Sequence, residues 1–545
     1  MTPDFDRPRP LPSSVADAWR QSGLWTASTV SEVVGAHIDL DDLDAPACVV
    51  DGERYTFGTL RHRSTTVAVD LARRGVARGD RVLIQLANSV ELVAAITACW
   101  RLGAIAVPVV PMFRTHELIS VVSQAGPAAV VAASVATGSR CPAAEVDAAV
   151  DAAGLAPLVR YHVGPQRPGW SPFPGGDHDE HDEHDGARLT GFDGAESCAL
   201  ILFTSGTTSE PKGVRHDSYS LLAEVNSYRR SASLCASDVI FNPAPISHIG
   251  ALVVSLLVPW SVGCPVVLQS RWDPQRAIEL IAQEKVTFAV GAPVFLTELV
   301  ERYEAGDDGG HRLSEFQTGA AATSTSVLRR AATVGISAWR AWGMTEAPTI
   351  SYGTASDPLD RRADTDGRIE PGSEVRAVDA DGRLLPPGAE GELVLRSPKQ
   401  MMGYLDARHD HSRPDGWLST GDLGRVDADG WVCITGRVKD IINRGGEKFS
   451  CREIEDALAS HPAVKAVAVL GVPEQRLGEQ VIAYVTVRPE AGYPGPDALT
   501  AHLAGLRLAP QKHPVAIMVV EQLPMTPTGK VLKTELARRW LDGTG

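Results

Sequence analysis

The chain is poor in cysteine and contains no paired cysteine motif. Its 545 residues include eight cysteines, and they sit alone, without a CxxC pair. Structural zinc sites and disulfide-rich secreted domains need clustered cysteines. The sequence therefore excludes both classes and predicts reduced thiols in a cytoplasmic protein.

Basic residues are also outnumbered. Lys and Arg total 52 against 67 Asp and Glu, which gives a net charge of −15. Nonspecific nucleic-acid binding and electrostatic membrane docking both need a basic surface. We therefore expect neither nucleic acid nor a membrane as a partner.

Long apolar segments of the kind that cross or enter membranes are missing. The N-terminal ten residues, MTPDFDRPRP, carry acids and prolines where a signal peptide would be apolar. The longest uncharged run, residues 246–270, is interrupted by His248, Pro259 and Gly263. This run predicts a buried helix followed by a buried strand.

Lysine is scarce, with nine residues among the 52 basic ones, and the first is Lys212. A compact ammonium group is not interchangeable with a guanidinium where a tight site must be entered. A lysine inside a glycine-rich loop of this chain is therefore a candidate functional residue.

The first third of the chain alternates strand and helix patterns. Residues 47–57 predict a hairpin with a turn at Asp51–Gly52, and Thr56 could cap the helix that follows. Apolar strands are expected at 81–87 and 104–110, with a helix between them. This rhythm is typical of an α/β fold with a mostly parallel sheet and helices on both faces.

The rest of the chain divides by pattern. Residues 166–196 are rich in Pro, Gly and acid, and predict a connector or an exposed loop. A second run of strands and helices follows to about residue 350, and short hairpin strands occupy 366–435. After Gly436 the pattern indicates a separate small α+β unit.

Three histidines, His178, His181 and His184, recur among acids in the connector. A metal site there is one interpretation, and a solvated loop is the other. The sequence does not assign a role to this segment, residues 175–186.

One segment, residues 202–214, has the composition of a phosphate-binding loop. It reads LFTSGTTSEPKGV and carries Lys212. Small residues let backbone N–H groups surround phosphate oxygens, hydroxyls add donors, and the lysine adds charge. The string is not a Walker loop, because GxxxxGK[ST] is absent.

TSGTTSEPKG resembles the phosphate-loop signature of the adenylate-forming superfamily, which includes acyl-CoA synthetases, adenylation domains of peptide synthetases, and luciferases. The resemblance extends in order along nearly the whole chain. The matching motifs are Pro245-Ile-Ser-His248, Gln317-Thr-Gly-Ala-Ala321, Trp342-Gly-Met-Thr-Glu346, Ser419-Thr-Gly-Asp422, Gly436-Arg-Val-Lys-Asp-Ile-Ile442, Arg444-Gly-Gly-Glu-Lys448 and Pro527-Thr-Gly-Lys530.

The resemblance implies a fold and a domain organisation. We expect an α/β protein whose large N-terminal domain, residues 1–436, holds two doubly wound βα subdomains and a small distorted β-barrel. A small mobile α+β domain, residues 437–545, would follow as a lid with its hinge near Lys439. ATP, Mg²⁺ and CoA are the implied cofactors and co-substrates.

The resemblance also implies a nucleotide site. Asp422 and Arg437 would bind the ribose hydroxyls, and Trp342 would stack on adenine where the family usually has tyrosine. Arg340 stands where many members have Asn or another polar residue that contacts adenine. The full set of expected nucleotide-binding residues is Thr204, Ser205, Gly206, Thr207, Thr208, Gly319, Ala320, Ala321, Trp342, Gly343, Met344, Asp422, Ile434 and Arg437.

The catalytic residues follow from the same resemblance. Lys530 would bridge the carboxylate and the α-phosphate, and Lys212 would hold the β- and γ-phosphates. Glu346 and the hydroxyl of Thr207 are the expected Mg²⁺ ligands. Thr345 completes the expected catalytic set.

In this family the lid rotates after adenylation and presents a second face for thioester formation. Lys439 aligns with the hinge residue. Gly445 and Gly446 would then let the pantetheine thiol approach, with Lys448 nearby. A basic patch of Arg444, Lys448, Arg452 and Arg476 favours CoA as the acceptor.

The expected acyl pocket is apolar and lined mostly by small residues. Its candidate walls are His248, Ile249, Gly250, Val254 and Pro348. His248 is either a pocket wall, a positioning donor or a core histidine. The C-terminal half is most similar to ligases of cyclohexanecarboxylate and related alicyclic acids, which favours a bulky alicyclic, aromatic or polycyclic acid, with a medium-chain fatty acid as the rival.

Three functions remain open at this point. The leading one is an AMP-forming acid–thiol ligase that uses ATP, a carboxylic acid and CoA. A stand-alone adenylating enzyme that loads a carrier protein or hands its adenylate to a downstream enzyme is the second, and an inactive binding partner is the third. A homodimer is a further alternative for the assembly.

Overall fold

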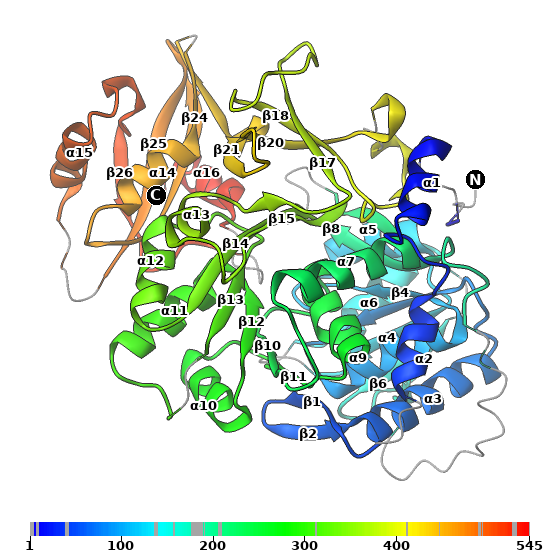
Figure 1. Cartoon of the computed structure of the whole chain (residues 1–545). Coiled ribbons are helices and arrows are strands. Elements are labelled where there is room, and N and C mark those ends of the chain that lie inside the picture. The colour runs from blue at the N-terminus through cyan, green and yellow to red at the C-terminus, as the bar shows by residue number, and fades with distance from the viewer. Residues whose placement is uncertain are drawn as a thin grey trace.

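The computed structural model of the chain describes most of its 545 residues. They are residues 5–6, 10–38, 43–135, 140–155, 158–175, 189, 191–204, 210–310, 313–409, 413–445, 447–488, 492, 494–525 and 531–543. Four sheets with helices packed on them make up the fold (Figure 1).

The first large sheet has eight strands in the order β19-β9-β8-β4-β3-β5-β6-β7. Strands β3 to β8 run parallel, whereas β9 pairs antiparallel with β8 and with β19. The strands are β3 Arg81–Gln85, β4 Ile105–Pro108, β5 Ala129–Ala133, β6 Val159–Val163, β7 Ser171–Pro172, β8 Cys198–Thr204, β9 Lys212–Asp217 and β19 Gly403–Tyr404.

The second large sheet has nine strands in the order β16-β15-β14-β13-β12-β10-β11-β1-β2. The strands are β1 Pro46–Val50, β2 Glu53–Thr56, β10 Ile240–Asn242, β11 Val266–Leu268, β12 Phe288–Gly291, β13 Glu315–Thr318, β14 Ser337–Met344, β15 Ala347–Tyr352 and β16 Arg368–Ile369. The predicted hairpin forms as β1 and β2, but it joins this second sheet, where β1 pairs parallel with β11.

A four-stranded antiparallel sheet follows, in the order β17-β18-β20-β21. Its strands are β17 Glu374–Val378, β18 Gly391–Arg396, β20 Leu418–Val426 and β21 Val432–Arg437. It occupies the stretch where the sequence predicts short hairpin strands and a small barrel.

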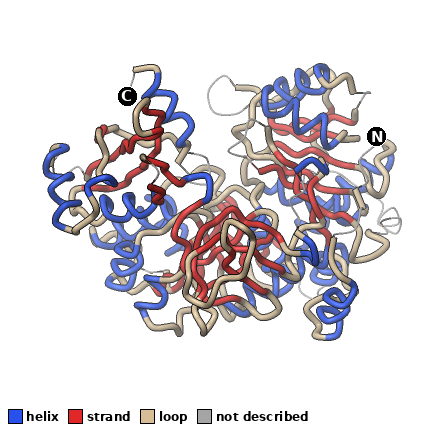
Figure 2. The backbone as a smooth tube through the Cα atoms, turned by 90° about the horizontal axis from the view of Figure 1, so that it is seen from above, coloured by secondary structure: helices blue, strands red, loops and turns tan. Residues whose placement is uncertain are grey.

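The C-terminal unit has its own five-stranded sheet. The strands are β22 Ile441–Arg444, β23 Glu447–Ser450, β24 Val464–Glu474, β25 Gly478–Val487 and β26 Ala516–Val519. Seen from above, this unit and the eight-stranded sheet lie on opposite sides of the molecule (Figure 2). The boundary between residues 436 and 437 stays a prediction.

Local signals explain where the helices begin. The Thr56 side chain accepts from the N–H of Thr59 at the start of α3, and Ser89 does the same for Leu92 at the start of α4. The helices of the N-terminal part are α1 Ser13–Gln21, α2 Val30–Ile38, α3 Phe57–Arg73, α4 Val90–Leu102, α5 Thr115–Ala125, α6 Pro142–Ala152, α7 Ser218–Ser231, α8 Ile249–Leu252, α9 Val258–Val262, α10 Pro274–Glu284, α11 Pro293–Glu304, α12 Thr325–Thr333 and α13 Leu359–Asp364. Those of the C-terminal part are α14 Cys451–Ala459, α15 Pro496–Gly505 and α16 Lys533–Leu541.

Short helical turns fill the remaining connections. A π-helical turn, η2 Val253–Leu257, lies between α8 and α9, and such turns often mark functional sites. The 3₁₀ turns are η3 Ala407–His409, η4 Pro414–Gly416, η5 Val438–Asp440 and η7 Pro510–Lys512.

One core joins the two large sheets. Buried side chains of α4, the 249–262 helical segment and both sheets pack together, with Trp100, Trp260 and Trp339 almost fully enclosed. Separate clusters cover the outer faces of the two sheets and both faces of the C-terminal sheet. The uncharged run 246–270 is buried as predicted.

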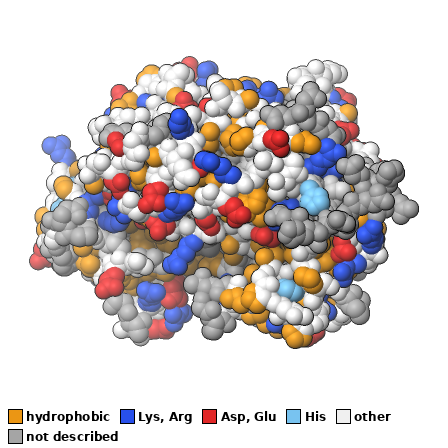
Figure 3. All heavy atoms as spheres, turned by 90° about the horizontal axis from the view of Figure 1, so that it is seen from below, with side chains coloured by type: hydrophobic (Ala, Val, Ile, Leu, Met, Phe, Trp, Pro, Cys, Tyr) orange, Lys and Arg blue, Asp and Glu red, His pale blue; other side chains and the backbone are white. Residues whose placement is uncertain are grey.

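The surface carries both signs of charge. On the face shown in Figure 3, acidic and basic side chains are interspersed. Among the described residues, every helix is too short or too polar to cross a membrane.

Candidate active site

The predicted phosphate loop connects two strands of the eight-stranded sheet. Thr204 ends β8 and faces Lys212, which begins β9 in antiparallel register. Ser205, Gly206, Thr207 and Thr208 lie outside the described residues. The strand pair thus holds the two ends of the loop side by side, as a loop closing on phosphates requires.

Tyr404, which the sequence analysis missed, contacts both Lys212 and Glu346. The Tyr404 hydroxyl donates to Oε1 of Glu346 at 2.6 Å, and the Lys212 ammonium lies 5.6 Å from the centre of the Tyr404 ring. Glu346 is 8% exposed. Tyr404 therefore fixes the Glu346 carboxylate beside the end of the phosphate loop. The Gly403–Tyr404 pair in β19 is the sequence feature that could have pointed to this residue.

Thr345 and Glu346 form the turn between β14 and β15, where Met344 pairs with Ala347. His216 on β9 supports this turn through Nε2, which lies 2.8 Å from the Thr345 carbonyl oxygen. The ring's Nδ1 lies 3.0 Å from the Ser220 hydroxyl. His216, fully buried, is thus a second positioning residue that the sequence analysis missed.

The expected ribose and adenine residues come together around one carboxylate. Trp342 Nε1 donates to Oδ2 of Asp422 at 2.8 Å, and Arg437 Nε lies 2.8 Å from Oδ1. Asp422 is 4% exposed, whereas the Arg437 side chain is half exposed. The carboxylate is held rigidly by two donors from different strands.

The loop after β13 forms an open rim. Ala320 has a left-handed backbone (φ +68°) and is exposed, while Gly319 and Ala321 are half-buried. The Thr318 and Thr323 hydroxyls, 3.0 Å apart, close the loop. This geometry suits a rim that faces a flat ligand.

Gly343 and Ile434 are placed by close backbone contacts. A Cβ at Gly343 would collide with the backbone nitrogen of Thr349, so only glycine fits there. The Ile434 N–H donates to Asp366 at 2.8 Å. Asp366, 7% exposed, is a third positioning residue outside the predicted set, and Met344 is half-buried next to Gly343.

Arg340 faces the C-terminal unit. Its guanidinium donates to the Thr325 hydroxyl at 3.1 Å and interacts electrostatically with Asp366, Arg452 and Asp456. Burial lowers the pKa of Arg340 and raises the pKa of Asp456. These charges lie where helix α14 packs on β21.

The expected acyl pocket lies at the start of the 249–262 helical segment. His248 precedes α8 and is half-buried, and Ile249 and Val254 are buried, with Val254 in the π-helical turn. Asn88 holds the loop before His248, because its side chain accepts from the Ile246 N–H and donates to the Ala244 carbonyl.

The other side of the pocket is β15. Pro348 is buried within β15, and α8 contacts this strand. Gly250 is half-buried, and a Cβ there would lie 3.4 Å from the Tyr228 hydroxyl. The predicted pocket residues thus lie on a helical segment and a strand that contact each other.

The hinge and thiolation residues lie at the start of the C-terminal unit. Lys439 is exposed in η5. Gly445 (φ +65°) opens the turn between β22 and β23, and its N–H donates to the Leu477 carbonyl at 2.7 Å. Lys448 is exposed on β23, and Gly446 lies outside the described residues.

Lys530 also lies outside the described residues, but its flanks are fixed. Met525 and Val531 form an antiparallel bridge, and the Leu532 N–H donates to the Pro524 carbonyl at 2.7 Å. His178, His181 and His184 likewise lie outside the described part of the chain.

The donor set at Glu346 suits Mg²⁺. Magnesium is usually held by one or two carboxylates together with water and substrate phosphates. A single buried carboxylate next to the phosphate loop matches that pattern. The described residues contain no cluster of three or more metal-ligating side chains. They therefore form no metal site that is enclosed by protein ligands alone.

Comparison with known proteins decides the family. A family profile described as "AMP-binding enzyme" matches residues 40–405, and its companion, "AMP-binding enzyme C-terminal domain", matches residues 453–530. The chain belongs to the AMP-binding enzymes.

Two curated relatives align over nearly the full length of this AMP-binding enzyme. The medium-chain fatty-acid–CoA ligase of Escherichia coli (strain K12) is 31% identical over 95% of this chain and 91% of its own. The salicylyl-CoA synthase / salicylate adenylyltransferase of a Streptomyces species is 31% identical over 97% of this chain and 96% of its own. The prediction of an AMP-forming acid–thiol ligase is confirmed at the level of the family.

A solved relative, MatB from Rhodopseudomonas palustris, is similar in its ATP-bound and apo forms. Both are 27% identical, covering 95% of this chain and all of MatB, but the TM-score is 0.80 for the ATP-bound form and 0.70 for the apo form. The α/β fold of this AMP-binding enzyme is confirmed. Because the two forms share one sequence, the difference reflects conformation, and this enzyme is arranged more like the ATP-bound form.

Proposed function

We propose that this AMP-forming acid–thiol ligase activates a bulky carboxylic acid as acyl-AMP and then transfers the acyl group to CoA. The acid carboxylate attacks the α-phosphorus of ATP, pyrophosphate leaves, and the CoA thiol then displaces AMP from the acyl carbon. The observation that carries the proposal is the β14–β15 hairpin, because its Glu346 accepts from Tyr404, whose ring Lys212 also approaches, and its Trp342 donates to Asp422.

In the first step, positioning and charge neutralisation dominate, because two anions must meet. Asp422 and Arg437 hold the ribose, Trp342 and the Gly319–Ala321 loop enclose the adenine, and Lys212 binds the terminal phosphates. Glu346 and the Thr207 hydroxyl would hold Mg²⁺, which neutralises phosphate charge when bound. Lys530 bridges the carboxylate and the α-phosphate.

In the second step, the C-terminal unit turns about Lys439 and presents Gly445, Gly446 and Lys448 to the pantetheine arm. Of the predicted basic patch, Lys448 and Arg476 are exposed, and they support CoA, whose phosphates need positive partners. A carrier-protein phosphopantetheine is the alternative acceptor. Its pantetheine arm would need only the turn at Gly445 and Gly446 to reach the acyl group, without the cations.

An alicyclic, aromatic or polycyclic acid fits the small apolar walls formed by Ile249, Gly250, Val254 and Pro348. Resemblance to cyclohexanecarboxylate ligases supports this class. The two curated relatives carry the names of a fatty-acid and a salicylate enzyme at the same 31% identity, so a medium-chain fatty acid is the second candidate.

The test is an incubation of the protein with ATP, Mg²⁺ and a panel of acids, with and without CoA, followed by mass spectrometry of AMP and acyl-CoA. The proposal expects acyl-CoA from cyclic acids in preference to octanoate. Acyl-AMP that never becomes acyl-CoA would favour a carrier protein, and octanoate as the best substrate would favour the fatty-acid alternative.

A further inference from the structure

A short segment that leads into β19, residues 399–404, holds Glu346 at two points. The Met401 N–H donates to the Glu346 carbonyl oxygen at 2.7 Å, and the Tyr404 hydroxyl donates to the Glu346 carboxylate at 2.6 Å. The end of the segment, β19, pairs with β9, which begins at Lys212. One segment therefore sets both the main chain and the side chain of the expected Mg²⁺ ligand.

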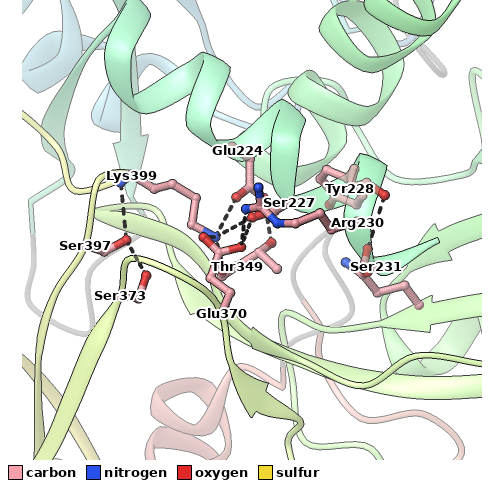
Figure 4. A network of polar contacts seen from close by, with 11 residues as sticks. Glu224, Ser227, Tyr228, Arg230, Ser231, Thr349, Glu370, Ser373, Ser397 and Lys399 are labelled. Atoms are coloured by element: carbon pink, nitrogen blue, oxygen red, sulfur yellow. Dashed lines mark hydrogen bonds and ion pairs between the residues drawn. The ribbon is translucent and has the colours of Figure 1, made fainter. Parts of the chain in front are cut away.

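The first residue of this segment, Lys399, lies in a buried network of charges. Its ammonium lies 2.7 Å from Glu370 and 3.2 Å from Glu224, and all three side chains are buried (Figure 4). It also donates to the Ser227 hydroxyl at 2.8 Å. Glu224 and Ser227 belong to α7, and Glu370 directly follows β16. Lys399 thus connects the segment to two other elements of the fold.

The network also reaches β15, the strand that begins directly after Glu346. Lys399 donates to the Thr349 carbonyl, and the Thr349 hydroxyl donates to Oε1 of Glu224 at 2.5 Å. Thr349 has a positive φ of +29°, which a β-branched residue keeps only where its surroundings impose it. The start of β15 is therefore held at Glu346 by Met401 and at Thr349 by Lys399.

The arrangement suits orientation better than stability. A buried charge network is a weak source of stability, because apolar side chains of similar volume often stabilise as well or better. Groups that orient a metal-ligating side chain matter more, since their loss typically costs about 10- to 100-fold in metal affinity or activity. Only Gln400 separates Lys399 from Met401, so a displacement of Lys399 would be transmitted to the donors on Glu346.

We propose that Lys399 is a positioning residue for the carboxylate of Glu346, and that it acts through Met401 and Tyr404. The buried cation fixes residues 399–404 against α7 and β15, and this segment holds the Glu346 carboxylate ready for the Mg²⁺ that accompanies ATP. Lys399 acts from inside the fold, because its side chain is fully buried. This inference rests on the proposed function and assigns the support of its metal-binding residue.

The test measures ATP binding without any acid, so it does not depend on the identity of the acyl substrate. Isothermal titration calorimetry gives the Kd of ATP in excess Mg²⁺ and in EDTA, and the ratio of the two constants reports the contribution of the metal. In Lys399→Met we expect the Kd in Mg²⁺ to rise about tenfold or more, while the Kd in EDTA stays the same.

Tyr404→Phe tests the connection between the network and the carboxylate. It keeps the ring, whose centre lies 5.6 Å from the Lys212 ammonium, and removes only the hydroxyl that donates to Glu346. It should therefore raise the Kd in Mg²⁺ alone. Combining it with Lys399→Met should add little to the larger single effect, because both changes act on one carboxylate.

Two further variants complete the test. Tyr161→Phe is the matched control, because it removes another buried tyrosine hydroxyl that is bonded to a carboxylate, Asp70, far along the same sheet in β6. It should leave both constants unchanged. Glu370→Gln is a milder change to the network that leaves Lys399 paired with Glu224, and it should raise the Kd in Mg²⁺ by a smaller factor. It replaces Lys399→Met in the test if that variant does not fold.

Equal rises in Mg²⁺ and in EDTA for the network variants would overturn the inference, because they indicate a general distortion of the nucleotide site. An unchanged ratio in Tyr404→Phe, or in every folded network variant, would overturn it as well. In these cases acyl-CoA formation by the wild type would leave the proposed function standing. A wild type that binds no ATP in either condition would overturn the proposed function and the inference together.

Discussion

The indole N–H of Trp342 donates to the carboxylate of Asp422 across 80 residues of sequence, at 2.8 Å. The resemblance predicts a stacking ring at position 342 and a ribose-binding acid at 422, but not a bond between them. The tryptophan therefore has two tasks in this enzyme: it offers a flat surface to adenine and it orients the ribose acid.

Trp342→Phe separates these tasks, because phenylalanine keeps a stacking ring and loses the donor. A hydrogen bond to a charged group contributes about 1.5–3 kcal/mol, so we expect KM for ATP to rise roughly tenfold or more, with a smaller change in kcat. Initial rates at varied ATP would measure this.

The control is Trp272→Phe, which removes a similar indole–carboxylate bond, Trp272 to Glu298 at 2.7 Å, in the cluster that packs α10 and α11 on the nine-stranded sheet. An unchanged KM in Trp342→Phe, or an equal rise in the control, would contradict the role given to Trp342.

Lys530→Ala should abolish most of the first half-reaction. Loss of one preorganised charge contact costs about 3–4 kcal/mol, or 10²–10³ in rate. We expect single-turnover adenylate formation to fall by that factor, while thioester formation from preformed acyl-AMP persists. Lys512→Ala, which breaks an exposed pair with Glu453, is the control, and similar losses in both variants would refute the assignment.

Lys399 is expected to be essential for stability, because its buried ammonium lies 2.7 Å from Glu370 and 3.2 Å from Glu224, both also buried (Figure 4). Lys399→Met leaves Glu224 and Glu370 buried without their shared cation, and breaking a buried pair typically costs about 3–5 kcal/mol. Urea unfolding should show this loss. Adding Glu370→Gln should recover part of it, and a double variant less stable than the single one would argue against charge imbalance as the cause.

The two parts of the chain are connected by a small ionic contact at Glu301 on α11. Its carboxylate lies 3.2 Å from Arg488, directly after β25, and 3.7 Å from Lys465 in β24. Such partly exposed pairs contribute under about 1 kcal/mol. Glu301→Gln should therefore shift the equilibrium between the arrangement with this contact and the one without it by up to about fivefold. Energy transfer between dyes on the two parts of the chain would measure the shift.

Salt is the control for this contact, because exposed charges are screened within about 3 Å at 1 M ionic strength. The wild type and Glu301→Gln should become alike in high salt. A difference that persists there would mean that Glu301 acts through packing.

Thiol reactivity should be confined to few positions. Burial raises the pKa of Cys48, Cys198, Cys264 and Cys451 to about 12, so at pH 8 about one thiol in 10⁴ is the reactive thiolate. Cys235 is exposed. We expect iodoacetamide at pH 8 to label Cys235 first, which peptide mass spectrometry would detect. Early labelling of Cys198 would instead show that the eight-stranded sheet opens.

The sequence alone determined the local elements and the family. Thr56 was recognised as a helix cap, because a hydroxyl before an apolar periodic segment satisfies free backbone N–H groups. The Asp51–Gly52 pair was recognised as a hairpin turn, because Asp-Gly favours the tight turn that connects two adjacent strands. Ordered motifs from Thr204 to Lys530 predicted the chemistry through their resemblance to the adenylate-forming superfamily.

Tertiary structure decided what depends on contacts distant in sequence. The hairpin of β1 and β2 pairs with β11, more than 200 residues away, and no local pattern encodes which sheet a strand joins. Tyr404 became part of the site only when β19 paired with β9. Lys399, Glu224 and Glu370 are single charged residues in sequence, and only folding makes them one network, because buried charges must find partners of opposite sign.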